Sequence, residues 1–366
     1  MPMKRSPNDP CFPEVKAFRM PAEWEPHEGL LLCYPRNGHD WPGKYGAIEW
    51  AFVEFILKVS ASEKVFVLVA DVATREKLSL KLEKAGVNAS RVEWILQRTN
   101  RSWMRDSGPI VVKHSSKTKA ERKDSRHCLS FCFNGWAKYP DHRLDAKVPT
   151  VVAQHLNLPM IEPIHRGRRI VLEGGAIDVN GKGTLLTTEE CLLHPSEQVR
   201  NPGFGKEDYE ALFKRYMGIT HTIWLHEGIV GDDTHGHVDD ITRFVGPKKL
   251  VTVMESRRSD ENYTRLRKNA RRLKAAVLED GTHPEVIELP MPSPVLFEGL
   301  RLPASYANFI ILNQSVLVPT FNDANDAAAL NILQSCFPGR QVIGIHSVDL
   351  IWGLGSLHCL SQQIPC

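Results

Sequence analysis

The sequence predicts a mixed α/β fold in which one supersecondary unit is repeated around a ring. Helical and extended hydrophobic patterns alternate along the 366 residues. Polar corners at Asp106, Glu173 and Asp239 follow strand-like runs at intervals of about 65 residues, so the chain would hold between five and six units. A closed ring would also leave no exposed sheet edge. The alternative is chance spacing in an ordinary α/β protein.

Six segments have the periodicity of amphipathic helices. In the first, Ile48, Phe52 and Phe55 fall on one face of a helix predicted over residues 46–62. The second is predicted over residues 73–85 and is closed by Gly86, which tolerates the left-handed backbone common after a helix. The other four are predicted over residues 145–156, 207–217, 261–278 and 325–335.

Nine runs have the composition of strands. Residues 65–70 form a continuous apolar run, which is typical of a strand that is buried on both faces. The remaining strands are predicted over residues 91–96, 110–112, 169–172, 222–224, 250–254, 286–289, 308–318 and 341–345.

Several of these runs lead into a polar, Gly-rich corner before the next strand. In a ring, the corners would meet at the centre and form one pocket. A fainter copy of the pattern occupies residues 285–312. The chemically active members of the four clearer corners are Trp103, Arg105 and Asp106; Glu173; Asp232, Asp233, His235, His237, Asp239 and Asp240; and His358 and Cys359.

This set of residue types suits attack on a guanidinium group. A carboxylate matches the N–H fork of a planar guanidinium, and two carboxylates would hold the plane while leaving the faces of the carbon open. A thiolate is the best nucleophile for that carbon. A histidine whose pKa lies near the operating pH would protonate the departing nitrogen and then activate water. We therefore predict Cys359 as a nucleophile that acts on a guanidinium carbon.

Local spacing assigns the neighbouring residues. His237 and Asp239 lie two residues apart, so on a strand their side chains would point to the same face. His358 adjoins Cys359 on a predicted strand and would face the other way, so we interpret it as structural. Taken singly, Cys359 has a plainer interpretation as buried core and Glu173 as a turn residue. These residues become candidates for a site because all four residue types occur at corners of one repeat.

Long motifs throughout the chain resemble the agmatine deiminase family of the guanidine-modifying superfamily, which also contains peptidylarginine and arginine deiminases. Several motifs in the right order are far more specific than one short pattern. The matching segments are MPAEWEPHEGLLLCYP (20–35), SWMRDSGP (102–109), FNGWAKYP (133–140), LEGGAIDVNGKGTLLTTEECLL (172–193), GDDTHGHVDD (231–240) and GLGSLHCLSQQIP (353–365).

The resemblance implies a pentein-type, five-bladed α/β propeller with its active site on the axis. We expect a single catalytic domain of about five ββαβ-type repeats over residues 1–366, with residues 1–19 as an N-terminal extension. The family implies a homodimer and requires neither a metal nor an organic cofactor. The roles implied by motif match are Cys359 as nucleophile, His237 as general acid and base, Glu173 as partner of His237, Asp106 and Asp239 as guanidinium clamp, and Trp103 beside the alkyl chain of the substrate.

The implied enzyme is a hydrolase of linear amidines that converts agmatine to N-carbamoylputrescine and ammonia, as in polyamine biosynthesis. Hydrolysis would proceed through a covalent intermediate on Cys359. An alternative within this class is another small guanidine, such as free arginine. A second alternative is a metallohydrolase, because His235, His237 and Asp239 echo an H-x-H-x-D ligand spacing. A third is a module that binds cationic ligands without turnover, although binding needs neither the cysteine nor the histidine.

Four residues depart from the usual family pattern and leave the identity of the substrate open. The family usually has a glycine where Leu354 stands and an asparagine where Ser356 stands. It also usually has asparagines at the positions of His235 and Asp240. The catalytic residue types are retained, so the departures concern the lining of the pocket.

Composition limits partners and compartment. The formal net charge of +3 is nearly balanced and gives no general attraction to nucleic acid or membrane. The N-terminal residues lack the apolar region of a secretory signal, and no apolar run reaches the length of a membrane span. The eight cysteines include no C-x-x-C pair. We therefore expect a cytoplasmic protein with a small cationic substrate and no nucleic-acid or membrane partner.

Overall fold

The computed structural model describes residues 18–114 and 125–366. Most of the N-terminal extension predicted over residues 1–19 therefore lies outside the described residues. Its last two residues form strand β1 (Phe18–Arg19), which pairs with β5 (Ile110–His114) and so belongs to a sheet.

Five sheets of three or four strands and two short hairpins make up the β-structure of the described residues. In each of the five sheets, a central strand pairs antiparallel with one neighbour and parallel with the next. A parallel neighbour needs a crossover connection, and helices supply it. The mixed α/β class predicted from the alternating patterns is confirmed.

One sheet joins the two ends of the described chain. The antiparallel pairing of β21 with β2 fixes the segment after Cys359 against the N-terminal part of the chain. Helices α1 (Tyr45–Ser62) and α2 (Val72–Lys84) make the crossovers. The strand order across this sheet is β21 (Ser361–Pro365), β2 (His27–Cys33), β3 (Lys64–Val69) and β4 (Val92–Leu96).

The other four sheets repeat this order with one or two helices each. They are β1, β5, β6 (Arg126–Leu129) and β7 (Met160–Ile161) with α4 (Val148–His155); β10 (Asp178–Val179), β11 (Thr184–Thr188) and β12 (His221–Leu225) with α5 (Glu189–Leu193) and α6 (Lys206–Met217); β13 (Thr242–Gly246), β14 (Lys249–Met254) and β15 (Glu285–Pro290) with α7 (Asn262–Ala275); and β18 (Ile310–Ile311), β19 (Ser315–Thr320) and β20 (Gln341–His346) with α8 (Asp326–Cys336). The two hairpins are β8 (Ile164–His165) with β9 (Arg168–Arg169) and β16 (Leu296–Phe297) with β17 (Leu300–Arg301).

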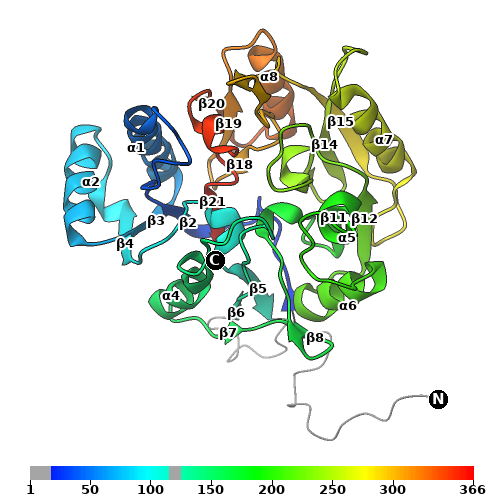
Figure 1. Ribbon diagram of the computed structural model, residues 1–366, viewed down its shortest axis with the longest axis horizontal. Coiled ribbons are helices and arrows are strands. Elements are labelled where there is room, and N and C mark those ends of the chain that lie inside the picture. The colour runs from blue at the N-terminus through cyan, green and yellow to red at the C-terminus, as the bar shows by residue number, and fades with distance from the viewer. Residues whose placement is uncertain (1–17, 115–124) are drawn as a thin grey trace, which may run out of the picture.

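The sheets surround a centre that holds the polar corners. Figure 1 shows sheets on all sides of this centre, with helices α2, α6, α7 and α8 toward the outside. No sheet of the described residues closes on itself, and the five-bladed propeller stays a prediction. The four clearer corners fold into short helical turns, namely α3 (Met104–Ser107), η4 (Gly174–Ala176), η5 (Val238–Asp240) and η6 (Leu350–Gly353).

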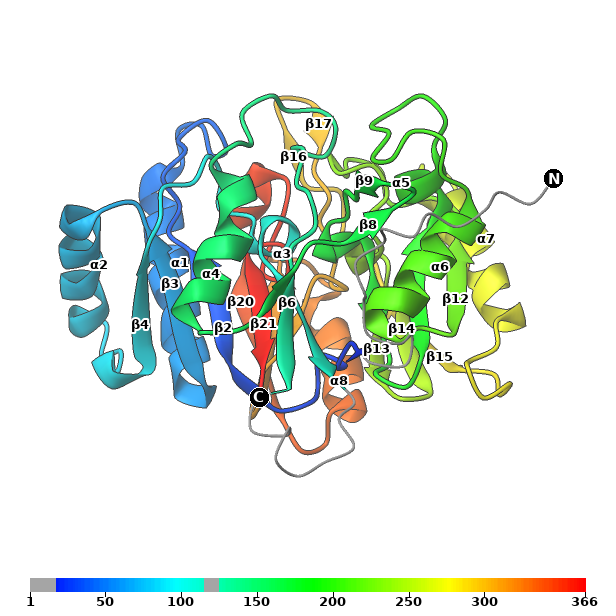
Figure 2. The same ribbon diagram turned by 90° about the horizontal axis from the view of Figure 1, so that it is seen from below.

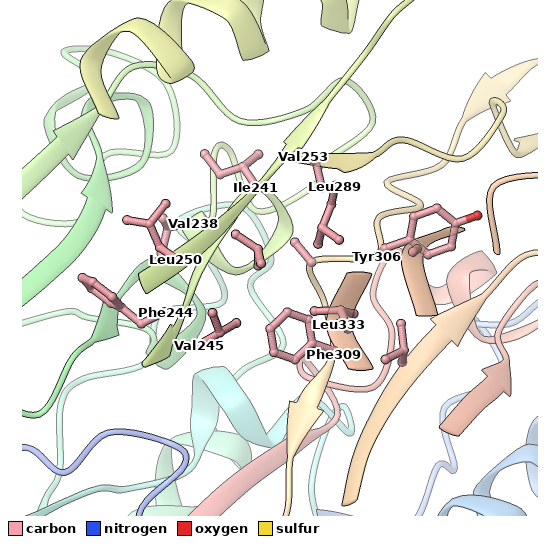
Figure 3. Close-up of a cluster of buried hydrophobic side chains, with 14 of the residues drawn as sticks. Val238, Ile241, Phe244, Val245, Leu250, Val253, Leu289, Tyr306, Phe309 and Leu333 are labelled. Atoms are coloured by element: carbon pink, nitrogen blue, oxygen red, sulfur yellow. The ribbon is translucent and has the colours of Figure 1, made fainter. Parts of the chain in front are cut away.

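The corners touch one another and rest on a continuous core. Turn α3 contacts η4, and η4 contacts η5. Val238 and Ile241, at the two ends of η5, are fully buried in a cluster that includes Phe244, Leu250 and Phe309 (Figure 3). Because packed interiors leave little free volume, this core fixes the position of the two aspartates between Val238 and Ile241.

Two predicted strands were wrong. The run predicted over residues 308–318 is a reversal, in which β18 and β19 pair antiparallel. The side-chain amide of Asn313 holds the turn through hydrogen bonds with the backbone N–H and C=O of His27. Both arms of the reversal are buried, so their apolar residues form one continuous run in the sequence, like that of a single strand. The run predicted over residues 169–172 lacks a continuous strand partner, because the side chain of Asn201 takes both the N–H and the C=O of Val171.

None of the helices in residues 18–114 and 125–366 has both the length and the apolar composition that are needed to span a bilayer.

Candidate active site

A cavity of about 660 Å³ opens where the polar corners meet. Its rim includes the β16–β17 hairpin, which lies at the opposite edge of the molecule from the C-terminus (Figure 2). Three of the six predicted site residues line the cavity: Trp103, Asp106 and Cys359. The other three are buried but do not line it: Glu173, His237 and Asp239.

Cys359 lies in a turn between η6 and β21, whereas we expected a strand at this point. The turn forms because the Oδ1 atom of Asn308 accepts the backbone N–H groups of His358 (3.0 Å) and Cys359 (3.4 Å). The Cys359 side chain is buried and contacts Asp239, with 3.9 Å between Sγ and Oδ2. Burial and the carboxylates of Asp239 and Asp240 raise the pKa of the Cys359 thiol well above its ordinary value.

His358 faces away from the cavity and is held on both sides by carboxylates. Its Nδ1 lies 2.6 Å from Asp239 Oδ2, and its Nε2 lies 2.9 Å from Glu23 Oε2. Glu23 in turn pairs with Arg243. Burial acts to raise the pKa of Asp239, but the hydrogen bond and charge of His358 lower it below its ordinary value. This side chain therefore fixes Asp239 and keeps it ionised.

Asp106 occupies turn α3 and faces the cavity. It accepts hydrogen bonds from Trp136 Nε1 (2.9 Å) and from the backbone N–H of Gly175 (3.1 Å). Burial raises the pKa of Asp106 to about 6, although His237 acts to lower it. The carboxylate is therefore ionised at neutral pH and can accept N–H donors from a cation in the cavity.

His237 is buried beside Asp106, and its ring nitrogens are not used in hydrogen bonds. Its Nδ1 lies 3.8 Å from Asp106 Oδ1, and neither ring nitrogen makes a hydrogen bond to the described residues. Burial acts to lower the pKa of His237, but Asp106, Cys191 and Asp239 raise it well above its ordinary value. A Cβ at Gly175 would lie 2.5 Å from Nδ1, so this close approach requires glycine. The ring is thus a protonated group that is available for proton transfer.

The sequence-based geometry of His237 and Asp239 was wrong in one respect. These residues do not lie on a strand, because His237 precedes the helical turn η5 and Asp239 lies within it. The carboxylate of Asp232 accepts the N–H groups of Gly236 (2.8 Å) and His237 (2.9 Å), which bends the chain before the turn. Both side chains are buried, and the charge of Asp239 is one of the influences that raise the pKa of His237.

Glu173 makes a different contact from the one that we predicted. Its Oε1 accepts a hydrogen bond from Arg200 Nε at 3.1 Å, and no hydrogen bond joins it to His237 in the described structure. Its second oxygen is buried without a partner. Ligand-type atoms of Glu173, Cys191 and His237 nevertheless lie within 4.8 Å of one another. Arg200 comes from a loop with no recognisable pattern, so no sequence signal identified it.

The structure does not bring together the three residues proposed as metal ligands. Among the described residues, His235 groups with His194 and Glu197, whereas His237 and Asp239 belong to two other groups. His235 contacts the ring of His194 edge to face, with 4.8 Å between ring centroids. The H-x-H-x-D spacing therefore does not form one site here, and the metallohydrolase alternative loses its ligand set.

Asn308 is a site residue that sequence reasoning missed. Its Nδ2 lies 3.1 Å from Cys359 Sγ and 2.9 Å from Asp240 Oδ1. The residue follows the β16–β17 hairpin, within the fainter copy of the repeat over residues 285–312. Its position at the corner of that copy was the available signal.

The sequence and fold were compared with known proteins. A family model described as Porphyromonas-type peptidyl-arginine deiminase matches residues 19–365, which is nearly the whole chain. The chain belongs to this family.

Relatives and solved structures in this family match over almost their full length. A protein of Marinomonas sp. (strain MWYL1) named "Putative agmatine deiminase" is 34% identical, with 96% of each chain covered. The structure of the agmatine deiminase of Enterococcus faecalis is 27% identical, with a TM-score of 0.84 and coverage of 95% of this chain and 96% of that one. A cysteine-to-serine variant of the C. jejuni agmatine deiminase with substrate bound is 28% identical, with a TM-score of 0.80 and the same coverage.

Two departures from the usual pattern of this deiminase family fall at left-handed backbone positions. Leu354, where the family usually has glycine, has φ of 69°, and His235, where it usually has asparagine, has φ of 67°. Glycine and asparagine adopt this conformation at little cost, so the residues present here are strained. Leu354 lines the cavity, whereas His235 does not.

The mouth of this deiminase cavity is apolar on one side and charged on the other. Phe297 of β16 stacks on Trp352 with 3.8 Å between ring centroids, and both line the cavity. On the charged side, Asp40 pairs with Arg101, and Asp233 accepts hydrogen bonds from Lys138 and Tyr139. One buried oxygen of Asp40, Oδ2, has no partner among the described residues.

Proposed function

We propose that this chain hydrolyses the guanidinium group of agmatine to give N-carbamoylputrescine and ammonia. The observation that carries the proposal is the arrangement around the cavity. The thiol of Cys359 and the carboxylate of Asp106 face one cavity, and the protonated His237 lies beside them without a hydrogen-bond partner. Agmatine is also named in the relatives that match over nearly the whole chain.

The substrate guanidinium lies between Asp106 and Asp239. Both carboxylates are buried, so their attraction for a cation is weakly screened. The bound cation also offsets the negative field that raises the pKa of Cys359, so the thiol loses its proton to solvent and the thiolate forms. Substrate binding and activation of the nucleophile are thus the same electrostatic event.

The first chemical stage replaces a nitrogen of the substrate with sulfur. The thiolate of Cys359 adds to the guanidinium carbon and forms a C–S bond. His237 gives its proton to the departing nitrogen, the C–N bond breaks, and ammonia leaves. A thiouronium-type intermediate remains on Cys359, and His237 is left neutral.

The second stage restores the enzyme. Neutral His237 takes a proton from a water molecule, and the resulting hydroxide attacks the same carbon. The C–S bond breaks and the thiolate of Cys359 is released, the new hydroxyl group gives its proton to solvent, and the product leaves as a neutral ureido compound. The unpartnered oxygen of Glu173 lies within the same group of atoms as His237, so Glu173 stabilises the histidine through charge in its protonated state.

The charges at the mouth favour agmatine over free arginine. Asp40 lines the cavity, and the charge of its carboxylate can attract the primary ammonium of agmatine. An α-carboxylate would need a cation, but the two lining arginines are paired with Asp40 and Asp260. Trp103 presents its indole to the cavity beside Cys359 and would pack along the alkyl chain.

The assignment is tested by ammonia release from a panel of agmatine, arginine and peptidyl arginine. Agmatine should give ammonia and the ureido product in equal amounts, and Cys359→Ser should abolish both. An unchanged rate in Cys359→Ser would overturn the proposal. Arginine as the faster substrate would keep the chemistry and change the substrate.

We further propose that the five sheets are the blades of a pentein-type propeller and that the chain is one catalytic domain. The common order of strand, antiparallel strand, helix and parallel strand in each sheet supports this arrangement. A cytoplasmic homodimer with no nucleic-acid or membrane partner is part of the same proposal. Light scattering on the purified protein tests the oligomer, since a monomeric mass at micromolar concentration would contradict it.

A further inference from the structure

We propose that Asn308 is a further catalytic residue, whose side-chain amide donates a hydrogen bond from Nδ2 to the Cys359 thiolate. The distance of 3.1 Å between Nδ2 and Sγ is within the range of such a bond. The inference rests on the proposed function of Cys359 as nucleophile. It adds a donor whose task is to stabilise the sulfur charge before the C–S bond forms.

The direction of the Asn308 amide is determined by its neighbours. Its Oδ1 accepts three donors, namely the Ser356 hydroxyl (2.7 Å) and the backbone N–H groups of His358 (3.0 Å) and Cys359 (3.4 Å). Its Nδ2 faces the Asp240 carboxylate at 2.9 Å and Cys359 Sγ at 3.1 Å. The opposite orientation would place Oδ1 against a carboxylate and three N–H or O–H donors against an NH₂ group. The amide therefore presents an N–H to sulfur.

The amide is also held rigidly. Asn308 is 1% exposed, and its own carbonyl accepts the N–H of His358 at 3.2 Å. The preceding Ser305 donates its hydroxyl to the backbone carbonyl of Asp240 (2.7 Å) and accepts the N–H of Ala307 (3.1 Å). Asn308 is thus tied to both the nucleophile loop and turn η5. A donor that is fixed before the reaction needs no reorganisation when charge appears on sulfur.

The surroundings of Cys359 show why such a donor is needed. Carboxylates that attract a guanidinium also repel a thiolate, and Asp239 lies 3.9 Å from Sγ. The Asn308 amide donates an N–H hydrogen bond to the sulfur of Cys359. Because the amide is uncharged, it does not repel a cationic substrate. A neutral amide can therefore stabilise the thiolate while the carboxylates still attract the guanidinium.

Asn308 acts on sulfur and not on the substrate. It does not line the cavity, so the inference predicts an effect on kcat with little effect on KM. The bond strengthens when the thiol ionises, because hydrogen bonds to charged groups are stronger than those between neutral groups. Its loss should raise the pKa of Cys359 by about one pH unit.

The test measures the thiolate of Cys359 without using substrate. Below the pKa, the rate of alkylation by neutral iodoacetamide follows the thiolate fraction, so a rise of one pH unit slows it about tenfold. The measurement uses the full chain with Cys366→Ser, because Cys366 is exposed and lies on the same proteolytic fragment. Mass spectrometry of that fragment reports Cys359 alone.

Asn308→Ala should slow the alkylation of Cys359 about tenfold at each pH between 6 and 9. The kcat for agmatine should fall by a similar factor, with KM within about twofold. The matched control is Asn269→Ala, which removes another fully buried amide that bonds to the backbone at His226 and Glu227. This control should leave the alkylation rate of Cys359 unchanged.

The proposal is overturned if folded Asn308→Ala alkylates at the rate of the unsubstituted chain, or if Asn269→Ala slows alkylation equally. Should Asn308→Ala fail to fold, Ser356→Ala serves instead, because it removes one of the bonds that orient the amide. It should slow alkylation in the same direction by a smaller factor, and no change would reject the proposal. If the unsubstituted chain releases no ammonia from agmatine, the proposed function fails while the alkylation result still decides the role of Asn308.

Discussion

The two buried histidines of the site, His358 and His237, differ in how their ring nitrogens are used. Both nitrogens of His358 bind carboxylates, at 2.6 and 2.9 Å, whereas neither nitrogen of His237 has a hydrogen-bond partner in the described structure. A histidine that is bonded through both ring nitrogens is held in one position. An unbonded one can exchange a proton with substrate and water. We therefore distinguish a rear side, in which His358 and Glu23 hold Asp239, from a front side made of Asp106, His237 and Cys359, where the proposed reaction takes place.

The two carboxylates of the proposed clamp differ in the same way. On the rear side, the pKa of Asp239 is lowered by His358, despite burial. On the front side, burial raises the pKa of Asp106 to about 6. Asp239 therefore keeps its charge in acid, whereas Asp106 loses its charge as the pH falls through about 6.

The largest expected effect is on the front side. His237→Gln should lower kcat by about 10²- to 10⁴-fold, because the departing nitrogen and the attacking water lose their proton donor and acceptor. Its stability at neutral pH should fall by about 1 kcal/mol or more, because the buried carboxylate of Asp106 loses the protonated ring beside it. Steady-state ammonia release and urea denaturation measure the two quantities. A kcat within threefold of the unsubstituted enzyme would remove His237 from the mechanism.

On the rear side, a substitution should reduce stability more than it reduces activity. His358→Gln leaves at least one of Asp239 and Glu23 without its partner, and breaking a buried, charge-assisted pair costs about 3 kcal/mol of unfolding free energy. Urea denaturation at pH 7 checks the loss. If His358→Gln kept full stability but lost its pH–rate profile, the two histidines would have to exchange roles.

The carboxylates of Asp106 and Asp239 should affect the stability of the folded protein differently as the pH changes. The folded-state pKa of Asp106 is about 6, above its ordinary value of 3.8. Its ionisation therefore disfavours the folded state above pH 6, and this cost disappears as the pH falls toward 4. Asp106→Asn should be more stable than the unsubstituted protein by about 2 kcal/mol at pH 8, with the difference closing by pH 4.

The same titration should appear in catalysis. Protonated Asp106 cannot clamp a guanidinium, so kcat/KM should fall as the pH drops through about 6. Denaturation curves and a pH–rate profile test the two consequences together. A stability difference that widened toward pH 4 would show that the pKa of Asp106 is lowered instead.

The sequence could predict the front-side chemistry better than the rear-side structure. Residue types at spaced corners were enough to predict Asp106, His237 and Cys359 as site residues, because the proposed reaction needs those types in any geometry. The partner of a buried group depends on long-range packing, which spacing does not encode. Arg200 contacts Glu173 from an unpatterned loop, and Asn308 lies in the faintest copy of the repeat.

Backbone geometry at the corners was also beyond reach from the pattern alone. A separation of two residues implies a shared face on a strand, but Asp232 caps the chain before His237 and converts the segment into a helical turn. Helices with strong periodicity were located within three residues, since their buried face spans several turns. The reversal near Asn313 was hidden because the apolar residues of both arms are buried.

The smallest expected effect concerns the strain stored just before the rear histidine. Leu354 has φ of 69°, a conformation that costs a residue with a Cβ about 1 kcal/mol or more. Leu354 adopts it at the end of turn η6, where its backbone N–H donates to the carbonyl of Ile351 at 2.9 Å. Leu354→Gly removes the backbone strain but also loses apolar contacts of a partly buried side chain. The two effects oppose, so the net change in stability should stay within about 1 kcal/mol.

Leu354→Val is the matched control for that prediction. Valine keeps most of the apolar contact but is branched at Cβ, so the left-handed backbone costs it more than leucine. Leu354→Val should therefore be less stable than Leu354→Gly, by about 1 kcal/mol in urea denaturation. Both should raise KM for agmatine modestly, because Leu354 lines the cavity, and leave kcat within a few-fold. If valine proved the more stable of the two, the backbone at Leu354 would not be under strain.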